Sequence, residues 1–259
     1  DLKRKITERT KVINITYLSG MIPNLEAIVA IAKEKDLTII EDISQNYGAT
    51  YRGQSIGTFG DAAIGSLSLG KCLSSLGGGF VITNNDALHE KIKSYCNNEL
   101  KEPKRKFLLK LGCGQLMVSI VTSKYFFNLV THPIFLLLSW LSPKKLEEIH
   151  NPKYYYKNIH KQSYYENPPL LRDRWPSDVL FHFSDLQAQL ALTTFKKFER
   201  GLLKRRELAK TLLGNLSSNV KNMLPGGIFD TDDCAYYHFP MFVDKNIKEY
   251  QGYLLNNGI

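Results

Sequence analysis

Residues 12–42 have the pattern of a strand, a helix and a second strand, and this pattern constrains the fold more than any other part of the chain. Residues 12–18 alternate apolar and polar side chains, as a strand does. Asn24 precedes apolar residues at helical spacing, and residues 37–40 form a short apolar run. A strand, a helix and a strand within about 30 residues are the size of one βαβ unit, so we expect an α/β protein.

The rest of the chain is expected to extend this organisation with short elements. The first half should add strands over 62–69 and 80–83 and a helix over 85–96. The second half should contain helices over 184–200 and 201–216, a strand over 236–243 and a short helix over 248–256. We therefore expect the second half to include a smaller α+β unit.

The net charge of +9 favours an acidic partner, which could be a nucleic acid, a membrane or an anionic small molecule. No nucleic acid is expected, because the basic residues flank an apolar stretch and do not alternate with aromatic side chains that stack on bases. The four cysteines form no CxxC pair and no metal-ligand spacing, so no metal site is expected. Thiols of this kind favour a reducing compartment such as the cytoplasm.

Two charged residues are the first candidates for chemistry. Asp42 follows the second strand, and ligands of α/β enzymes bind beyond the carboxyl ends of strands, although a helix or turn cap explains this carboxylate equally well. Lys71 is the one charged residue between positions 62 and 83. Desolvation would lower the pKa of its amine and favour the free base that forms Schiff bases, and the alternative is an exposed loop lysine.

Ser66 and the run Gly77-Gly78-Gly79 are weaker candidates. Ser66 lies five positions before Lys71 and could bind a phosphate or be an ordinary strand residue. The glycine run could be a phosphate loop, but it lacks the spacing of the known phosphate-binding motifs, which favours a tight turn.

Several of these residues fall within one longer motif. Residues 41–49, Glu-Asp-Ile-Ser-Gln-Asn-Tyr-Gly-Ala, with the glycines that follow, resemble the EDxAQxxGA…G…G…GD segment of the DegT/DnrJ/EryC1/StrS family. Residues 66–71 resemble its SFxxxK segment. Residues 184–188 and 205–206 resemble its SdlQAA and RR segments, so the resemblance covers about residues 1–98 and 175–259.

This resemblance implies a fold-type I enzyme that uses pyridoxal 5'-phosphate (PLP). Residues 1–100 would form part of the large PLP-binding domain, with a mostly parallel sheet flanked by helices. Residues 151–259 would form connecting helices and part of a small C-terminal α+β domain. A homodimer is implied as well.

The resemblance also implies roles for five residues. Lys71 would form the Schiff base with PLP and move the proton during transamination. Asp42 would keep the pyridine nitrogen protonated, and Gln45 would donate a hydrogen bond to the phenolic oxygen of the ring. Ser44, where the family usually has Ala, would lie against the ring, and Ser66 would bind the phosphate.

The chain departs from the family pattern at several positions. Asn46 and Tyr47 replace the usual Ala and His. Leu180 and His182 stand where an Asn and an Arg are usual, which affects a phosphate contact across the dimer. The family's N-terminal segment, with a Gly-Thr phosphate turn and an aromatic residue that stacks on the ring, is not in the sequence, so we expect a fragment of a longer protein.

The activity expected from this resemblance is transfer of an amino group, from glutamate, to a keto sugar on a nucleotide or lipid diphosphate. Such a reaction belongs to the biosynthesis of amino sugars and surface polysaccharides, and an anionic substrate suits the basic charge. The alternative is a catalytically inactive relative that acts as a membrane-associated binding or scaffold protein. A sugar dehydratase of the same fold is disfavoured, because those relatives replace the Schiff-base lysine with histidine and Lys71 is retained here.

Residues 101–150 form an insertion outside the family pattern. Within it, residues 111–143 contain Lys124 as their one charged residue and lie between basic clusters at 101–110 and 144–145. Basic residues on both sides argue against a single membrane span and favour a re-entrant or interfacial hairpin with a bend at Pro133, at the inner face of the membrane. The alternative is an apolar insertion packed on the protein's own core or on a dimer partner.

Overall fold

The chain divides into two compact units. The computed structural model describes residues 1–68, 70–142, 180–225, 233–242, 249–250 and 253. The first unit consists of Asp1–Leu108 and Phe181–Val243, and the second of Leu109–Leu180 and Asp244–Ile259.

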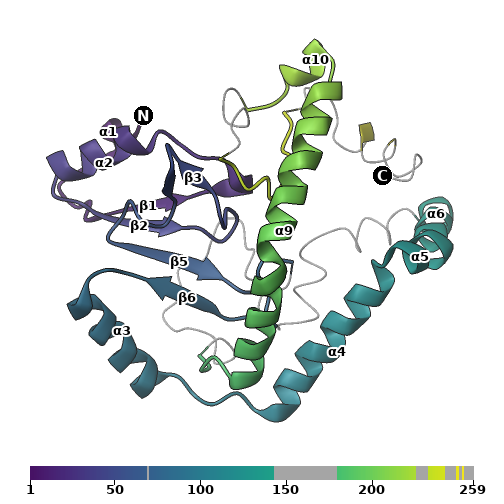
Figure 1. Ribbon diagram of the computed structural model, residues 1–259, viewed down its shortest axis with the longest axis horizontal. Helices are drawn as coiled ribbons and strands as arrows, with labels where there is room; N and C mark the ends of the chain where they lie inside the picture. Colours follow the sequence, from purple (N-terminus) through teal and green to yellow (C-terminus); the bar gives the residue numbers. More distant parts are fainter. Residues whose placement is uncertain (69, 143–179, 226–232, 243–248, 251–252, 254–259) are drawn as a thin grey trace. The chain divides into compact units, whose positions relative to one another are not determined.

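A four-stranded sheet with the order β1-β2-β5-β6 is the centre of the first unit (Figure 1). Strands β1 (Val12–Thr16), β2 (Thr38–Asp42) and β5 (Ala62–Ser66) are parallel, and β6 (Gly79–Ile82) pairs antiparallel with β5. Helix α2 (Leu25–Glu34) connects β1 to β2. The expected α/β class, the βαβ unit and the mostly parallel sheet are confirmed.

The sequence explains why these elements form where they do. The side chain of Asn24 accepts a hydrogen bond of 3.0 Å from the Ala27 N–H, which caps α2. Leu25 of α2 is fully buried. Alternate residues of β1 are buried, because successive side chains of a strand point to opposite faces of the sheet. The smaller elements of this half are α1 (Leu2–Lys5), η1 (Leu18–Gly20), the hairpin β3 (Thr50–Tyr51) and β4 (Gln54–Ser55), and α3 (Asp86–Glu99).

A single helix, α9 (Asp185–Asn215), replaces the two helices expected over 184–200 and 201–216. That expectation was wrong because a glycine at position 201 lowers helix stability by about 1 kcal/mol but does not end a helix between strong helix formers. Helix α9 passes close to the turn after β2, where Gly48 has a φ of 75°. A Cβ atom on Gly48 would lie 2.7 Å from a methyl group of Leu202, so this turn requires glycine.

The segment expected to be a strand over 236–243 has no strand conformation in its described part, residues 236–242. Its backbone bonds to loops and not to a neighbouring strand: the His238 N–H donates to the Ser19 carbonyl, and the Phe242 N–H to the Met223 carbonyl. Short α10 (Ser218–Lys221) precedes it. Of the helix expected over 248–256, the described residues 249, 250 and 253 are helical, and the others lie outside the described residues.

The second unit contains helices over most of the apolar insertion. They are α4 (Arg105–Val121), which begins in the first unit, α5 (Lys124–Phe126), the π-helix η2 (Phe127–Thr131) and α6 (His132–Leu141). The chain bends at Ser123, which has φ −65° and ψ 142°, and not at Pro133 as expected. Pro133 lies in the first turn of α6, where proline is tolerated, and the π-helix before it accommodates the missing N–H. Among the described residues, no helix combines the length and the apolarity that a membrane span needs.

Candidate active site

The predicted site residues lie at the carboxyl ends of two adjacent parallel strands. Asp42 is the last residue of β2 and Ser66 the last of β5, and Asp42 lies opposite Ile64 in the register of the two strands. Ser44 and Gln45 follow β2, and Lys71 follows β5. The parallel pairing of β2 with β5 therefore places residues that are separate in the sequence at one edge of the sheet, where α/β proteins bind ligands.

The Asp42 carboxylate is half-buried and is oriented by the backbone that follows it. Its Oδ1 accepts a hydrogen bond of 3.0 Å from the Ser44 N–H. The Asp42 carbonyl accepts from the Tyr17 N–H at 3.2 Å. This turn therefore holds one carboxylate oxygen in place at the strand end.

Gln45 has a defined amide orientation. Its Oε1 accepts a hydrogen bond of 2.7 Å from the Ser19 N–H, where the backbone has a positive φ of 59°. Because the oxygen is used in this bond, the Nε2 group is the part of Gln45 that can donate to a ligand. An amide donor suits an anionic oxygen such as the phenolate of PLP.

Tyr47 and Ser68 position the end of β5. The Tyr47 hydroxyl donates a hydrogen bond of 2.7 Å to the Ser66 carbonyl, and the Ser66 Oγ lies 2.9 Å from the Ser68 Oγ. Burial raises the pKa of Tyr47 to about 12, while hydrogen bonds with Ser66 and Ser44 act in the opposite direction. Tyr47 is therefore a neutral donor that joins the turn after β2 to Ser66.

Lys71 lies beside two aromatic residues from the C-terminal part of the chain. Its Nζ is 5.1 Å from the centre of the Tyr237 ring, a cation–π distance, and the Tyr237 hydroxyl donates to the Gly70 carbonyl at 2.8 Å. Burial lowers the pKa of His238, and the charge of Lys71 lowers it further. Sequence reasoning missed both Tyr237 and His238, because the strand expected there had no link to Lys71.

Glu41, the residue before Asp42, is fully buried, and its carboxylate accepts hydrogen bonds that stabilise the fold. Its Oε2 accepts from the Tyr17 hydroxyl at 2.5 Å and from the Gly57 N–H at 2.7 Å. Its Oε1 accepts from the N–H groups of Phe59 and Gly60, both at 2.7 Å. Burial and this carboxylate raise the pKa of Tyr17. The burial of Glu41 could have been predicted from the sequence. Glu41 lies two positions after Ile39 in β2, so the two side chains point to the same buried face of the sheet.

Two arginines of α9 hold residues 233–235 against the site. Arg205 Nε donates to the Ala235 carbonyl, and Arg206 Nε donates to the Cys234 carbonyl, both at 3.1 Å. Asn46 Oδ1 accepts from the Ala235 N–H at 3.0 Å. Among the described residues, Asn46 Nδ2 and Arg205 Nη2 are buried without a hydrogen-bond partner.

The glycine run after Lys71 forms a turn between β5 and β6. The Gly77 N–H donates to the Leu67 carbonyl at 3.2 Å, and the Leu67 N–H donates to the Gly78 carbonyl at 2.9 Å. Gly77 and Gly78 have φ values of 109° and 86°, which other residues rarely adopt. This geometry is that of the tight turn favoured by the sequence.

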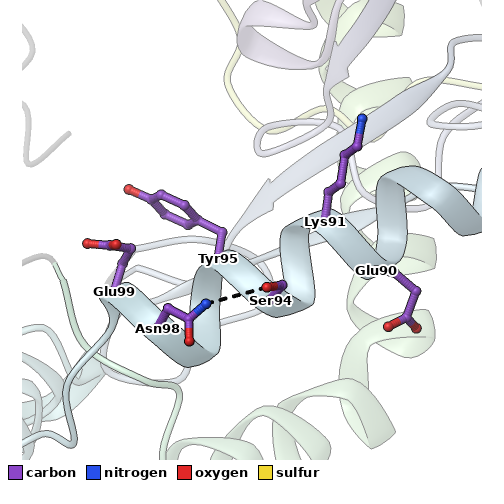
Figure 2. A pocket seen from close by; sticks show the side chains of 6 residues that line it. All are labelled: Glu90, Lys91, Ser94, Tyr95, Asn98 and Glu99. Atoms are coloured by element: carbon purple, nitrogen blue, oxygen red, sulfur yellow. Dashed lines mark hydrogen bonds between the residues drawn. The ribbon is translucent and has the colours of Figure 1, made fainter.

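Helix α3 presents a separate hollow on its surface (Figure 2). The six side chains that line it come from this one helix: Glu90, Lys91, Ser94, Tyr95, Asn98 and Glu99. None of them is a predicted site residue, so the hollow is distinct from the edge of the sheet that holds Asp42 and Lys71.

The motif that contains these residues lies within a longer segment that is similar to a known family. Residues 1–120 match the DegT/DnrJ/EryC1/StrS aminotransferase family. The match covers less than half of the chain, and over these residues the chain is similar to that family. Aminotransferases of the DegT/DnrJ/EryC1/StrS family use PLP, as the resemblance in the sequence implied.

Curated relatives match over short stretches. The pleiotropic regulatory protein of Geobacillus stearothermophilus is 45% identical over 89 residues, which are 34% of this chain and 24% of that protein. GDP-perosamine synthase of Escherichia coli is 37% identical over 91 residues, 35% of this chain and 25% of the synthase. The putative L-glutamine:3-amino-2,3-dideoxy-scyllo-inosose aminotransferase of Streptomyces kanamyceticus is 38% identical over 98 residues, 38% of this chain and 23% of that protein. The matches thus span only a quarter or less of each relative's length.

Solved structures show the same fold over about half of their length. The Helicobacter pylori aminotransferase PseC, described as involved in pseudoaminic acid biosynthesis, has a TM-score of 0.59 and 18% identity, over 99% of this chain and 52% of that chain. The GDP-4-keto-6-deoxy-D-mannose-3-dehydratase of Escherichia coli, with bound hydrated PLP, has a TM-score of 0.56 and 17% identity, over 100% of this chain and 54% of that chain. The fold-type I class expected from the sequence is confirmed.

The donor set at this edge of the sheet fits PLP. It offers a carboxylate for a protonated pyridine nitrogen, an amide donor for an anionic oxygen, hydroxyls for a phosphate and a lysine amine for the aldehyde. The part of the chain that the structure describes contains no group of three His, Cys, Asp or Glu side chains that could hold a metal ion. The fit to PLP rests on the carboxylate, amide, hydroxyl and amine groups named above.

Proposed function

We propose that this chain is part of a PLP-dependent aminotransferase that acts on a keto sugar carried on a diphosphate. The observation that supports the proposal most is the position of Asp42, Gln45, Ser66 and Lys71 around the carboxyl ends of β2 and β5. These four residue types are those that PLP requires, and residues 1–120 are similar to a family of aminotransferases.

In this proposal, the residues after β2 and β5 hold the cofactor. Asp42 binds the pyridine nitrogen, and the Ser44 N–H keeps its carboxylate in place. Gln45 donates its amide N–H to the phenolic oxygen, because its own oxygen is bonded to Ser19. Ser44 lies against the ring, and Ser66 binds the phosphate.

Lys71 is the proposed acid and base of the reaction. PLP, when bound, supplies an electron sink for the charge that proton removal leaves on the substrate carbon. Lys71 removes this proton and returns it through Nζ. The Tyr237 ring restrains the lysine side chain, and the lowered pKa of His238 keeps a second positive charge away from it at neutral pH.

The proposed substrate is a keto sugar on a nucleotide or lipid diphosphate. The net charge of +9 suits an anionic substrate, and relatives include a GDP-perosamine synthase. The proposed donor is glutamate or glutamine, since the names of two inosose aminotransferases among the relatives specify L-glutamine. We further propose a cytoplasmic homodimer in a pathway to amino sugars or surface polysaccharides.

Borohydride reduction of the PLP-loaded protein, followed by peptide mapping, tests the role of Lys71. The loaded protein should have a visible absorbance band that borohydride removes. The reduced PLP adduct, which serves as the label, should map to the Lys71 peptide. The Lys71→Ala variant should lose the label, and Lys91→Ala, at an exposed lysine of α3, should keep it. A label on another lysine, or full turnover by Lys71→Ala, would overturn the assignment.

Turnover of a GDP- or TDP-linked keto sugar tests the activity, with L-glutamate and L-glutamine compared as donors. Asp42→Asn should leave the protein folded and reduce turnover by about 100-fold or more, because the pyridine nitrogen loses its counter-ion. Normal transamination by this variant would show that the carboxylate has a structural role only.

A further inference from the structure

The helices of the insertion expose apolar side chains along their whole length. No residue of α4, α5 or η2 is buried. Large side chains with more than half of their surface exposed include Leu116 at 62%, Met117 at 69%, Tyr125 at 80%, Leu129 at 77%, Leu137 at 53% and Trp140 at 79%. We call these six residues the α4–α6 apolar surface. Exposed large apolar side chains gathered on one segment point to an interaction site.

The charges on the same segment have one sign. Residues 103–142 contain no Asp or Glu, and their charged residues are Lys104, Arg105, Lys106, Lys110 and Lys124. Four of these five precede or lie within the first two turns of α4. Positive side chains at a helix N-terminus are repelled by the partial positive charge of the helix dipole there, so these cations do not stabilise α4. Binding of an anionic partner would compensate this positive charge.

The helices of the insertion are short and are separated by a bend, which is suited to lying along a surface. Helix α4 has 17 residues and is thus about 26 Å long, which is less than the ~30 Å of a bilayer's hydrocarbon core. The chain turns at Ser123, and the Thr131 hydroxyl donates to the Val121 carbonyl at 2.8 Å, which ties η2 to the end of α4. Tyr125 and Trp140 are the most exposed aromatic residues here, and these two types concentrate at membrane–water interfaces.

We propose that the α4–α6 apolar surface binds to the surface of an anionic phospholipid bilayer without crossing it. The apolar side chains enter the boundary between headgroups and acyl chains, and the cations of α4 contact lipid phosphates. A second copy of this segment is a poorer occupant, because it has the same cations and no acidic side chain over residues 103–142 to pair with them. This inference does not rest on the proposed catalytic activity.

Flotation of the whole protein with lipid vesicles tests the proposal. The protein should float with vesicles of phosphatidylcholine that contain about a quarter phosphatidylglycerol, float less with phosphatidylcholine alone, and be partly released by salt. Replacing Lys104, Arg105 and Lys106 with Gln should lower the partition onto anionic vesicles by about fivefold per residue. The triple variant Leu116→Ser, Leu129→Ser, Trp140→Ser should abolish flotation.

A matched control uses equally exposed apolar residues in the first unit. Leu192 and Leu203 of α9 are 62% and 59% exposed, and replacing both with Ser should leave flotation unchanged. Far-ultraviolet circular dichroism of each variant should match the parent protein. Flotation of the triple Ser variant at the parent level, or a parent protein that stays in the soluble fraction, overturns the proposal. A triple variant that loses oligomer mass in light scattering, with no flotation of the parent, would instead identify a contact between protein chains.

Discussion

At the scale of single residues, two neighbouring carboxylates have different surroundings. Glu41 is fully buried and accepts four hydrogen bonds, three of them from backbone N–H groups. Asp42 is half-buried at the strand end and is bonded to the Ser44 N–H. Because side chains alternate across a strand, one carboxylate enters the core and the other points toward the candidate site. The same dipeptide therefore supports the fold through Glu41 and is available for chemistry through Asp42.

We expect Glu41→Gln to destabilise the protein by about 2–4 kcal/mol. The amide group would place an N–H₂ donor against the N–H donors of residues 57, 59 and 60, and the negative charge that strengthens these bonds would be lost. Denaturant unfolding followed by circular dichroism measures the change. Glu26→Gln is the control, since Glu26 forms an exposed ion pair with Arg52 and should change stability by less than about 1 kcal/mol. Equal effects of the two variants would contradict the structural role of Glu41.

At the scale of elements, the start of α9 joins the long helix to the site. Ser184 and Gln187 form a capping box, with the Ser184 N–H donating to Gln187 Oε1 at 3.1 Å. Gln187 is buried and its Nε2 also donates to the Gly77 carbonyl, at 3.4 Å. The first turn of α9 therefore contacts the glycine turn that follows Lys71.

Ser184→Ala should destabilise the protein by about 1 kcal/mol, because the Gln187 N–H loses its acceptor. Ser184→Asp keeps an acceptor at the N-cap and adds a negative charge near the positive end of the helix dipole, so it should retain most of the stability. Thermal unfolding and hydrogen exchange at residues 185–188 measure both effects. Loss of stability in Ser184→Asp equal to that in Ser184→Ala would exclude the capping role.

At the scale of the first unit, an arginine of α9 links the C-terminal segment to the turn that follows β2. Arg206 Nη2 lies 3.3 Å from the carbonyls of Gly48 and Asp233, while its Nε donates to the Cys234 carbonyl. The Thr50 hydroxyl donates to the Asp233 carboxylate at 2.5 Å. The bonds Arg206–Gly48 and Thr50–Asp233 connect residues more than 150 positions apart, and together the four bonds hold the segment that leads to Tyr237.

Arg206→Lys should destabilise the protein by about 1–2 kcal/mol, because one ammonium group cannot reproduce the fixed fork of a guanidinium that contacts three carbonyls. Chemical unfolding measures the loss, and limited proteolysis near residues 233–238 should be faster than in the parent protein. Arg200→Lys, at an exposed position on the same helix, is the matched control and should change neither measurement. Parent-level stability in Arg206→Lys would show that these backbone contacts contribute little.

The sequence by itself determined the local elements of the site. The periodicity of residues 12–42 predicted β1, α2 and β2, and the cap residues Asn24, Asn85 and Ser184 placed three helix starts correctly. Periodicity and helix caps depend on residues a few positions apart, so they can be predicted from the local sequence. The position of Asp42 at a strand end followed from the same patterns, and the motif that contains it predicted the similarity to the family. The strand expected over 62–69 ends earlier in the structure, at Ser66.

Only the tertiary structure decided which distant residues meet. Tyr237 donates to the carbonyl of Gly70, 167 positions away, and thereby places its ring against Lys71. The continuous α9, the loop over 236–242 and the bend at Ser123 also differ from the local expectation. In each case the outcome depends on contacts or backbone geometry that a single-sequence pattern does not contain. Helix propensity outweighs one glycine, and hydrogen bonds to distant loops replace the neighbouring strand that residues 236–242 would need.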